Sequence, residues 1–234
     1  MSTGSLYLLP TFLGNRDQRF LSQRSLEATR RLKYFVAEDA KSARSFLKAI
    51  QHPMPLQEIV IAELNEHTLP EAVAPLLRPV LDGHDCGIIS EAGLPGIADP
   101  GAALVRLAQQ KGIRVHPIAG SSSLFLALMA SGLNGQSFRF HGYLPRDHAA
   151  RRQRLIELEK EVRRNGTTQL FIETPYRNDA LFDDILRTCD PSLLLCIAVD
   201  LETEQELVQT SSLADWKKKK PGLHKRPCVF ILGA

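Results

Sequence analysis

The sequence predicts an α/β protein of two domains, the first built around a parallel sheet and the second around a mixed sheet. Up to Gly132, short apolar runs alternate with amphipathic stretches of helical period, which is typical of strands alternating with helices. Beyond Gly132, strand-like runs follow one another more closely, which favours mixed or antiparallel pairing. The composition, 44% hydrophobic and 24% charged, is that of an ordinary globular protein. We place the domain boundary between residues 1–118 and residues 119–234.

Up to Gly132, every predicted strand is followed by a predicted helix. The strands are 6–9, 34–37, 58–64, 86–90 and 113–118, and the helices are 21–32, 40–50, 68–83, 102–110 and 122–130. Thr68 and Glu71 have the spacing of a capping box, and Pro70 is tolerated in the first turn. Asp99 and Pro100 suit the start of the next helix, with Asp99 as N-cap and Pro100 at the first helical position.

The second domain begins with a strand at 138–143 and a long charged helix at 146–164. Further strands are expected at 168–173, 193–201, 206–209 and 228–232, and a further helix at 180–188. The last two strands flank a lysine-rich turn. Consecutive strands of this kind predict a mixed sheet.

Charge, hydropathy and cysteine usage exclude several classes of protein. The 29 Lys and Arg residues nearly balance the 26 Asp and Glu residues, and both kinds are spread evenly along the chain. No segment therefore has the excess of positive charge that is typical of a nucleic-acid-binding arm. The longest apolar run, 124–130, is far shorter than the roughly 20 residues that span a bilayer. The four cysteines show no paired spacing, which indicates buried thiols in a reducing, cytoplasmic compartment. Dinucleotide, P-loop and HExxH patterns are absent, and no metal is expected.

Three local clusters of basic residues remain to be explained. They are Arg16, Arg19 and Arg24; Arg151, Arg152 and Arg154; and the lysines at 217–220. Each is either a solvated face or charged turn, or a docking surface for phosphates.

The segment 90–101, SEAGLPGIADPG, is the most informative part of the sequence. Ligands of open parallel sheets bind beyond the carboxyl ends of the strands, and this segment follows an apolar strand. Ordinary connections in such folds have about two to six residues, and this one is longer and rich in Gly and Pro. It predicts a ligand-binding loop, with a rigid Ω-loop as the structural alternative.

Three shorter loops occupy equivalent places after other strands. Gly14 and Asn15 follow the first strand, where a common turn is the alternative to a binding loop. Glu38 and Asp39 follow the second, and Asp39 is either a ligand contact or general base, or the N-cap of the next helix. Gly120 opens a serine-rich turn after the fifth strand, suited to holding an anion or to capping a helix.

Together these segments resemble the S-adenosylmethionine-dependent tetrapyrrole methylase superfamily, and within it the bacterial enzymes that 2'-O-methylate a cytidine ribose in 16S ribosomal RNA. The resemblance covers most of the chain. It rests on LYLLPTFLGN (6–15), AEDAKSARSFL (37–47), SEAGLPGIADPG (90–101), HPIAGSSS (116–123), FRFHGYLPRD (138–147) and LFIETPYRN (170–178).

The resemblance implies two α/β domains with S-adenosylmethionine in the cleft between them, and a homodimer. The cofactor-binding residues that it implies are Pro10, Leu13, Glu91, Gly93, Leu94, Pro95, Ser121, Ser122, Glu173, Thr174 and Tyr176. The residues that it places where the methyl acceptor enters are Glu38, Asp39, Asn15 and Arg177. Ribosomal RNA or the small ribosomal subunit is the implied partner, and no membrane is involved.

The chain departs from the pattern of the ribosomal RNA enzymes at several positions. Those enzymes usually have Asp where this chain has Glu91, a less serine-rich loop at 121–123, and Gly-Glu where this chain has Arg226 and Pro227. They also commonly continue past the last strand with a helical segment, whereas this chain stops at Ala234, which would make it a short form.

The expected reaction is direct displacement at the sulfonium methyl, for which the protein supplies mainly positioning. A ribose hydroxyl needs a base to take its proton, and Asp39 and Glu38 are the candidates. The first alternative is a methyltransferase for a small molecule such as a tetrapyrrole, with Tyr176, Phe12 and Phe171 lining an apolar cleft. The second alternative is a non-catalytic module that binds the cofactor.

Overall fold

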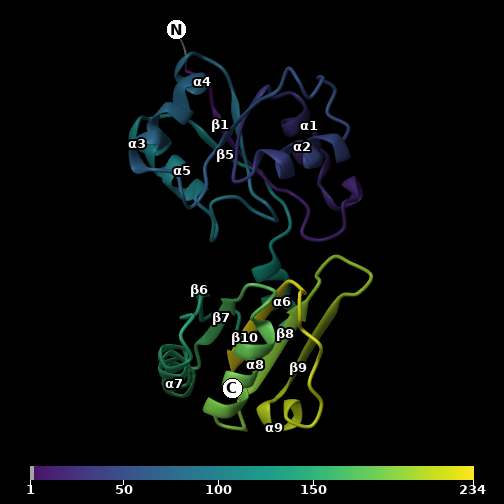
Figure 1. Cartoon of the computed structure of the whole chain (residues 1–234), viewed down its shortest axis with the longest axis vertical. Coiled ribbons are helices and arrows are strands. Elements are labelled where there is room, and N and C mark those ends of the chain that lie inside the picture. Colours follow the sequence, from purple (N-terminus) through teal and green to yellow (C-terminus); the bar gives the residue numbers. More distant parts are fainter. Residues whose placement is uncertain (1–2) are drawn as a thin grey trace. The chain divides into compact units, whose positions relative to one another are not determined.

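The computed structural model describes residues 3–234, which separate into two compact units (Figure 1). The first unit extends to Ser122 and the second begins at Ser123, a few residues after the boundary expected from the sequence. Each unit has its own sheet and its own buried clusters, and each is described by itself below.

The first unit is built on a five-stranded sheet in which all strands are parallel. The strands are β1 (Leu6–Leu9), β2 (Tyr34–Ala37), β3 (Val60–Glu63), β4 (Cys86–Ile89) and β5 (Val115–Pro117), in the order β3-β2-β4-β1-β5. Leu6 is paired with Cys86 and with Val115 on the two neighbouring strands. The parallel sheet predicted for this part of the chain is thus confirmed.

Helices cover both faces of this sheet because side chains alternate along each strand. On one face, Leu9 and Phe35 pack with α1 (Gln23–Arg30) and α2 (Ala40–Ala49), after a short 3-10 turn, η1 (Gln18–Phe20). On the other, Leu6 and Ile88 pack with α5 (Gly101–Gln110) and with the short turns α3 (Pro70–Val73), η2 (Ala74–Leu77) and α4 (Arg78–Leu81). Figure 1 shows these two groups of helices on opposite sides of the strands.

Two predicted helix starts are wrong in this unit. Thr68 caps no helix: its hydroxyl accepts the N–H of Asn65 at 2.9 Å, and Leu69 occupies the N-cap without a side-chain bond. The stretch 68–83 is three short turns instead of one helix, because Pro75 and Pro79 have no N–H to donate. At α5 the N-cap is Pro100 and the helix begins at Gly101.

The second unit has a mixed sheet, as the sequence predicted. Its strands are β6 (Phe138–Tyr143), β7 (Thr168–Ile172), β8 (Leu194–Val199), β9 (Leu207–Ser212) and β10 (Cys228–Gly233), in the order β6-β7-β10-β8-β9. Only β6 and β7 are parallel; the pairs formed by β10 with β7 and β8, and by β8 with β9, are antiparallel.

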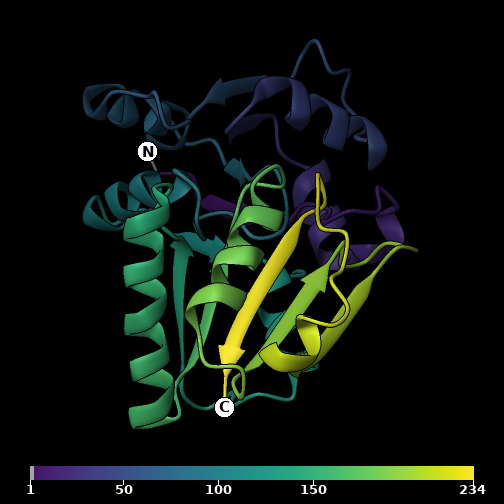
Figure 2. The ribbon, with the colours of Figure 1, turned by 60° about the horizontal axis from the view of Figure 1, so that its bottom comes forward.

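Helices also cover both faces of the second sheet. The long α7 (His148–Asn165), α8 (Asn178–Thr188) and the short α9 (Leu213–Trp216) pack on one face, and α6 (Ser123–Ser131) packs on the other. Figure 2 shows α7 and α8 running side by side. The sequence did not predict α9, which anchors Trp216 in the core through a bond from Nε1 to the Leu195 carbonyl.

Two residues with an expected surface role are part of the second core. Arg151, expected on a solvated face or a phosphate-binding surface, is 1% exposed because it forms an ion pair with buried Asp184. Phe171, a candidate for lining an apolar cleft, is 0% exposed and stacks on Phe230. Both of these expectations are wrong, because inward-pointing positions on α7 and β7 place these side chains in the core.

All four cysteines are buried and unpaired, which confirms the prediction of buried thiols. Burial raises the pKa of Cys86 and Cys189 to about 12, so neither is a thiolate near neutral pH. Among residues 3–234, no helix is long and apolar enough to cross a membrane.

Candidate active site

Four loops leave the first sheet at one edge, because all five strands run in the same direction. They follow β1, β2, β4 and β5, the places where the sequence predicts binding loops. The loop after β1 is tied to the long loop after β4: the Thr11 N–H donates to the Gly93 carbonyl at 2.9 Å, and Thr11 Oγ1 donates to the Ser90 carbonyl at 3.3 Å. Sequence reasoning missed Thr11 and Ser90, although each is a hydroxyl residue at the end of an apolar strand.

Two glycines allow these loops to pack against each other. Gly93 has φ of +71°, and a Cβ there would lie 2.8 Å from Leu13 Cδ2 and 3.4 Å from the Ser121 carbonyl oxygen. A Cβ on Gly120 would lie 2.2 Å from Pro10 Cβ. Pro10, Leu13, Gly93 and Ser121, predicted from different parts of the sequence, therefore converge at one place.

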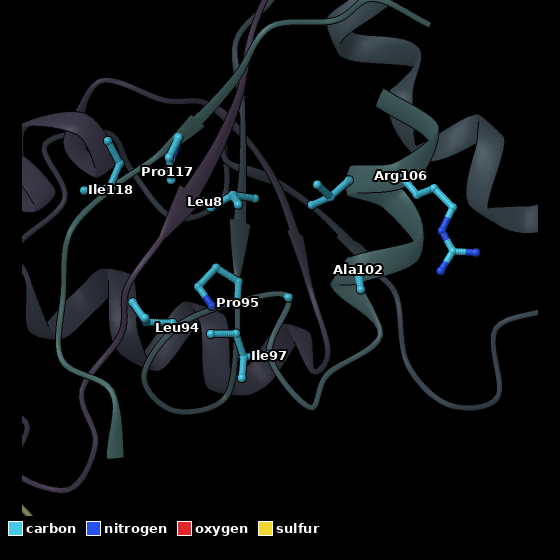
Figure 3. A pocket seen from close by; sticks show the side chains of 10 residues that line it. Leu8, Leu94, Pro95, Ile97, Ala102, Arg106, Pro117 and Ile118 are labelled. Carbon is cyan, nitrogen blue, oxygen red and sulfur yellow. The ribbon is translucent and has the colours of Figure 1, made fainter. Parts of the chain in front are cut away.

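A pocket of about 460 Å³ lies beside this convergence (Figure 3). Its lining includes Leu94 and Pro95, which were predicted to bind the cofactor. The other lining residues are Leu8, Gly96, Ile97, Ala102, Val105, Arg106, Pro117 and Ile118. Arg106 is the one charged residue among them, and the volume is within the usual range of small-molecule pockets, about 300 to 1,000 Å³.

A second pocket, of about 200 Å³, lies between the loop after β1 and α2. Leu13 and Glu91 line it together with Arg16, Ser42 and Ser45, and with Thr11, Phe12, Gly14, Phe46 and Ser90. Arg16 Nη1 donates to Ser45 Oγ at 2.9 Å. Asn15 is half-buried, and in the sequence it lies between Gly14 and Arg16, which both line this pocket.

The structure separates the two candidate bases, Glu38 and Asp39. Asp39 is the N-cap of α2: its Oδ1 accepts the Ser42 N–H at 2.7 Å, and hydrogen bonds from Ser42 hold its pKa below the usual value. The capping alternative for Asp39 is therefore confirmed. Burial raises the pKa of Glu38, and the negative charges of Glu91, Asp99 and Glu66 raise it further. A carboxylate in that environment is the stronger proton acceptor.

The Asp99 side chain stabilises the long loop after β4 by hydrogen bonds to the backbone of that loop and of the start of α5. Its Oδ1 accepts the N–H groups of Gly96 at 2.8 Å and Gly101 at 2.7 Å, so it bonds the first residue of α5 without being its N-cap. Burial raises the pKa of Asp99, and these two bonds act in the opposite direction. Asp99 also lines a small pocket together with Glu38 and Ser90, which places its charge near Glu38.

The remaining predicted residues belong to the turn after β7 in the second unit. Glu173 is buried, and its Oε1 accepts the Thr174 N–H at 2.6 Å and Arg177 Nη2 at 2.5 Å. Its Oε2 has no hydrogen-bond partner among the described residues. Tyr176 is 71% exposed. Ser122, the last residue of the first unit, is half-buried.

Comparison with known proteins shows the class and then the family. No family model matches the chain. The methyltransferase CobJ superposes with a TM-score of 0.67 at 15% identity over 99% of this chain and 94% of its own. The uroporphyrin-III-C-methyltransferase from Thermus thermophilus superposes with a TM-score of 0.57 at 18% identity, over 98% of this chain and 92% of its own. The parallel first sheet and the mixed second sheet thus have the fold shared by the tetrapyrrole methylases.

Sequence relatives then identify the branch. Ribosomal RNA small subunit methyltransferase I from Pseudomonas aeruginosa is 33% identical over 235 residues, which span 99% of this chain and 79% of the relative. The protein of the same name from Xylella fastidiosa is 35% identical over 215 residues, or 92% and 75% of the two chains. This chain belongs to the ribosomal RNA small subunit methyltransferase I family.

Proposed function

We propose that this protein transfers a methyl group from S-adenosylmethionine to a ribose 2'-hydroxyl of the small-subunit ribosomal RNA. The observation that carries the proposal is the close packing of Gly93 against Leu13 and Ser121 beside the pocket of about 460 Å³. Two relatives of at least 33% identity bear the name of an enzyme acting on this RNA. The tetrapyrrole alternative is supported only by a likeness of fold at 18% identity or less.

The first unit has the features that the cofactor needs. Its apolar pocket suits the adenine and the methionine side chain, and the absence of a Cβ at Gly93 allows Leu13 and the turn at Ser121 to pack beside that pocket. In the proposal, Pro10, Leu13, Leu94 and Pro95 give apolar contacts. Glu91 and the serine turn at 121–122 bind the polar groups.

Glu38 is the proposed base of the reaction. S-adenosylmethionine supplies an electrophilic methyl group on its sulfonium. Glu38 takes the proton of the ribose hydroxyl while the new O–CH₃ bond forms and the S–CH₃ bond breaks, which leaves S-adenosylhomocysteine and a protonated carboxyl. Asp39 holds the start of α2 instead, and Asn15 positions the acceptor.

A matched pair of glycine variants tests cofactor binding. Gly93→Ala places a Cβ 2.8 Å from Leu13 Cδ2, whereas Gly112→Ala, at φ of +67° after α5 and outside the pocket lining, meets nothing within 4 Å. Both substitutions strain the backbone, so backbone strain does not distinguish them. Calorimetric titration with S-adenosylmethionine is expected to show binding by wild type and Gly112→Ala and a clear loss by Gly93→Ala. Equal affinities for all three would contradict the proposed site.

Transfer of a labelled methyl group to unmodified small subunits tests the acceptor. Label in a ribose of the RNA supports the proposal, label in a tetrapyrrole supports the alternative, and cofactor binding without any transfer supports a non-catalytic module. The proposal includes a homodimer that works in the cytoplasm. Sedimentation of the purified protein and fractionation of cells check these two parts.

A further inference from the structure

Tyr176 is the most exposed aromatic residue of the second unit, and two basic side chains surround it. The ring is 71% exposed. It makes an edge contact with His224, with ring centroids 6.2 Å apart, and Lys225 Nζ lies 5.8 Å from its centroid. His224 and Lys225 are themselves exposed. We call Tyr176, His224 and Lys225 the aromatic–basic surface.

The aromatic–basic surface is held in place by the backbone of two loops. The Lys225 N–H donates to the Pro175 carbonyl at 2.9 Å, and the Arg177 N–H closes the turn around Tyr176 by donating to the Thr174 carbonyl at 2.9 Å. Asn178 Nδ2 donates to the Arg226 carbonyl at 2.7 Å from the buried start of α8. The exposed ring is therefore presented by a fixed scaffold.

The conformation of Lys225 points to a function. Its φ is +61°, a left-handed conformation that is unfavourable for any residue other than glycine and uncommon outside Asn and Asp. Strain of this kind is retained where a side chain is needed, and here it places an ammonium group beside an aromatic ring.

Neighbouring basic groups are already paired, which leaves Lys225 available for a ligand. Arg177 binds Glu173, Arg226 Nε donates to Asp200 Oδ2 at 2.6 Å, and Lys220 donates to Asp183. Within residues 3–234, no carboxylate lies within ion-pair distance of Lys225. An aromatic face with an unpaired cation beside it is the arrangement that binds single-stranded nucleic acid, with a base on the ring and a phosphate on the cation.

We propose that the aromatic–basic surface binds an unpaired nucleotide of the acceptor RNA, with its base stacked on Tyr176 and its phosphate on Lys225. This inference rests on the proposed function and assigns Tyr176 to the acceptor instead of to the cofactor. Stacking on the ring accepts any base, so the surface holds the strand and leaves sequence selection to other contacts.

Fluorescence anisotropy with a labelled, unstructured oligoribonucleotide of about 12 nucleotides tests the surface on the full chain. Tyr176→Leu is expected to weaken binding about tenfold, and Tyr176→Trp to retain it. Lys225→Gly is expected to weaken binding and to lower the salt slope by about 0.7, while its thermal midpoint stays equal or rises because glycine accepts the left-handed backbone. Lys111→Gln, which removes an exposed charge in the first unit, is the control and is expected to bind as wild type does.

The outcomes distinguish this inference from the proposed function. Unchanged affinity of Tyr176→Leu and Lys225→Gly for RNA overturns the inference, as does preference of the wild type for duplex RNA. A loss of S-adenosylmethionine affinity in Tyr176→Leu with unchanged RNA affinity also overturns it, because the ring would then contact the cofactor. Methyl transfer by the wild type to the small subunit is measured separately, so its failure would count against the proposed function alone.

Discussion

Arg151 and Asp184 form a buried ion pair that joins α7 to α8 in the second unit. Arg151 donates from Nε at 2.8 Å and from Nη2 at 2.5 Å to the same carboxylate oxygen, Asp184 Oδ2, and both side chains are almost fully buried. Arg151 Nη1 also donates to the Arg146 carbonyl at 3.2 Å, so the pair fixes the chain that enters α7. The guanidinium is therefore held by hydrogen bonds to the Asp184 carboxylate and to the backbone that precedes α7.

Removing one member of this pair is expected to destabilise the protein strongly. Asp184→Asn leaves the Arg151 charge buried without a counter-charge, and we expect a loss of about 3 to 5 kcal/mol in the free energy of unfolding of the second unit. The double variant Arg151→Met with Asp184→Leu is expected to lose much less free energy of unfolding than Asp184→Asn, because it leaves neither charge of this pair buried alone. Urea denaturation of the three proteins measures the difference, and equal losses in the single and double variants would contradict the pairing.

The same ion pair makes the stability of the fold depend on pH. Burial by itself acts to raise the pKa of Asp184, but hydrogen bonds from His148 and Arg151 outweigh it and hold the pKa below the usual value. A carboxyl with a lowered folded-state pKa stabilises the fold above its unfolded pKa of about 3.9, and this contribution disappears as the pH falls through the folded-state value. Thermal midpoints measured from pH 7 down to about pH 3 are expected to fall more steeply in wild type than in Asp184→Asn.

Glu38 is expected to combine a loss of activity with a gain in stability on substitution. Because its pKa is raised on folding, ionising it opposes folding at any pH above its ordinary value of 4.5, and Glu38→Gln removes that opposition. Methyl transfer by Glu38→Gln is expected to fall about 10²- to 10⁴-fold, the usual contribution of a general base. Parallel rate measurements and thermal scans at pH 7 check both, and a fully active variant would exclude Glu38 as the base.

The pH dependence of the wild-type methyl-transfer rate tests the proposed role of Glu38 independently. In the proposed mechanism the carboxylate form is the active one, so the rate is expected to fall on acidification. The fall is expected to begin at a higher pH than for an ordinary glutamate, because burial and neighbouring carboxylates raise the pKa of Glu38. Rates at saturating cofactor and RNA, measured over a pH range in which the protein stays folded, give the midpoint. Asp99→Asn removes one of those neighbouring charges and is expected to move the midpoint to lower pH.

Asp39 is expected to behave in the opposite way to its neighbour. Asp39→Ala removes the N-cap bond to the Ser42 N–H, which is expected to lower the free energy of unfolding of the first unit by about 1 kcal/mol. The turnover number should stay near that of wild type, because the side chain is bound to α2. Asp39→Ser restores a capping oxygen and is expected to recover most of the stability; a loss of turnover in Asp39→Ser would assign Asp39 a role in the reaction.

Local sequence determined the elements and the place of the binding loops. The strands at 34–37 and 138–143 lie where the alternating and apolar patterns put them, and segment 90–101 forms a loop at the carboxyl edge of the sheet. Side-chain period and Gly-Pro content act over a few residues, so they can be interpreted without knowledge of distant contacts. The likeness of segment 90–101 to known methyltransferases predicted a class and family that the comparisons then showed.

Tertiary structure alone decided the partner of each polar side chain. Arg151 and Arg152 are adjacent in the sequence and both pair with Asp184, yet the side chain of the first is buried and that of the second is 46% exposed. Asp39 caps α2 through a local bond that the sequence offered as one alternative, but only the fold gives its neighbour Glu38 a set of negative groups from distant loops. A hydrogen bond or a pKa depends on groups that the fold brings together from distant parts of the chain, so the sequence names the candidates and the packing assigns their roles.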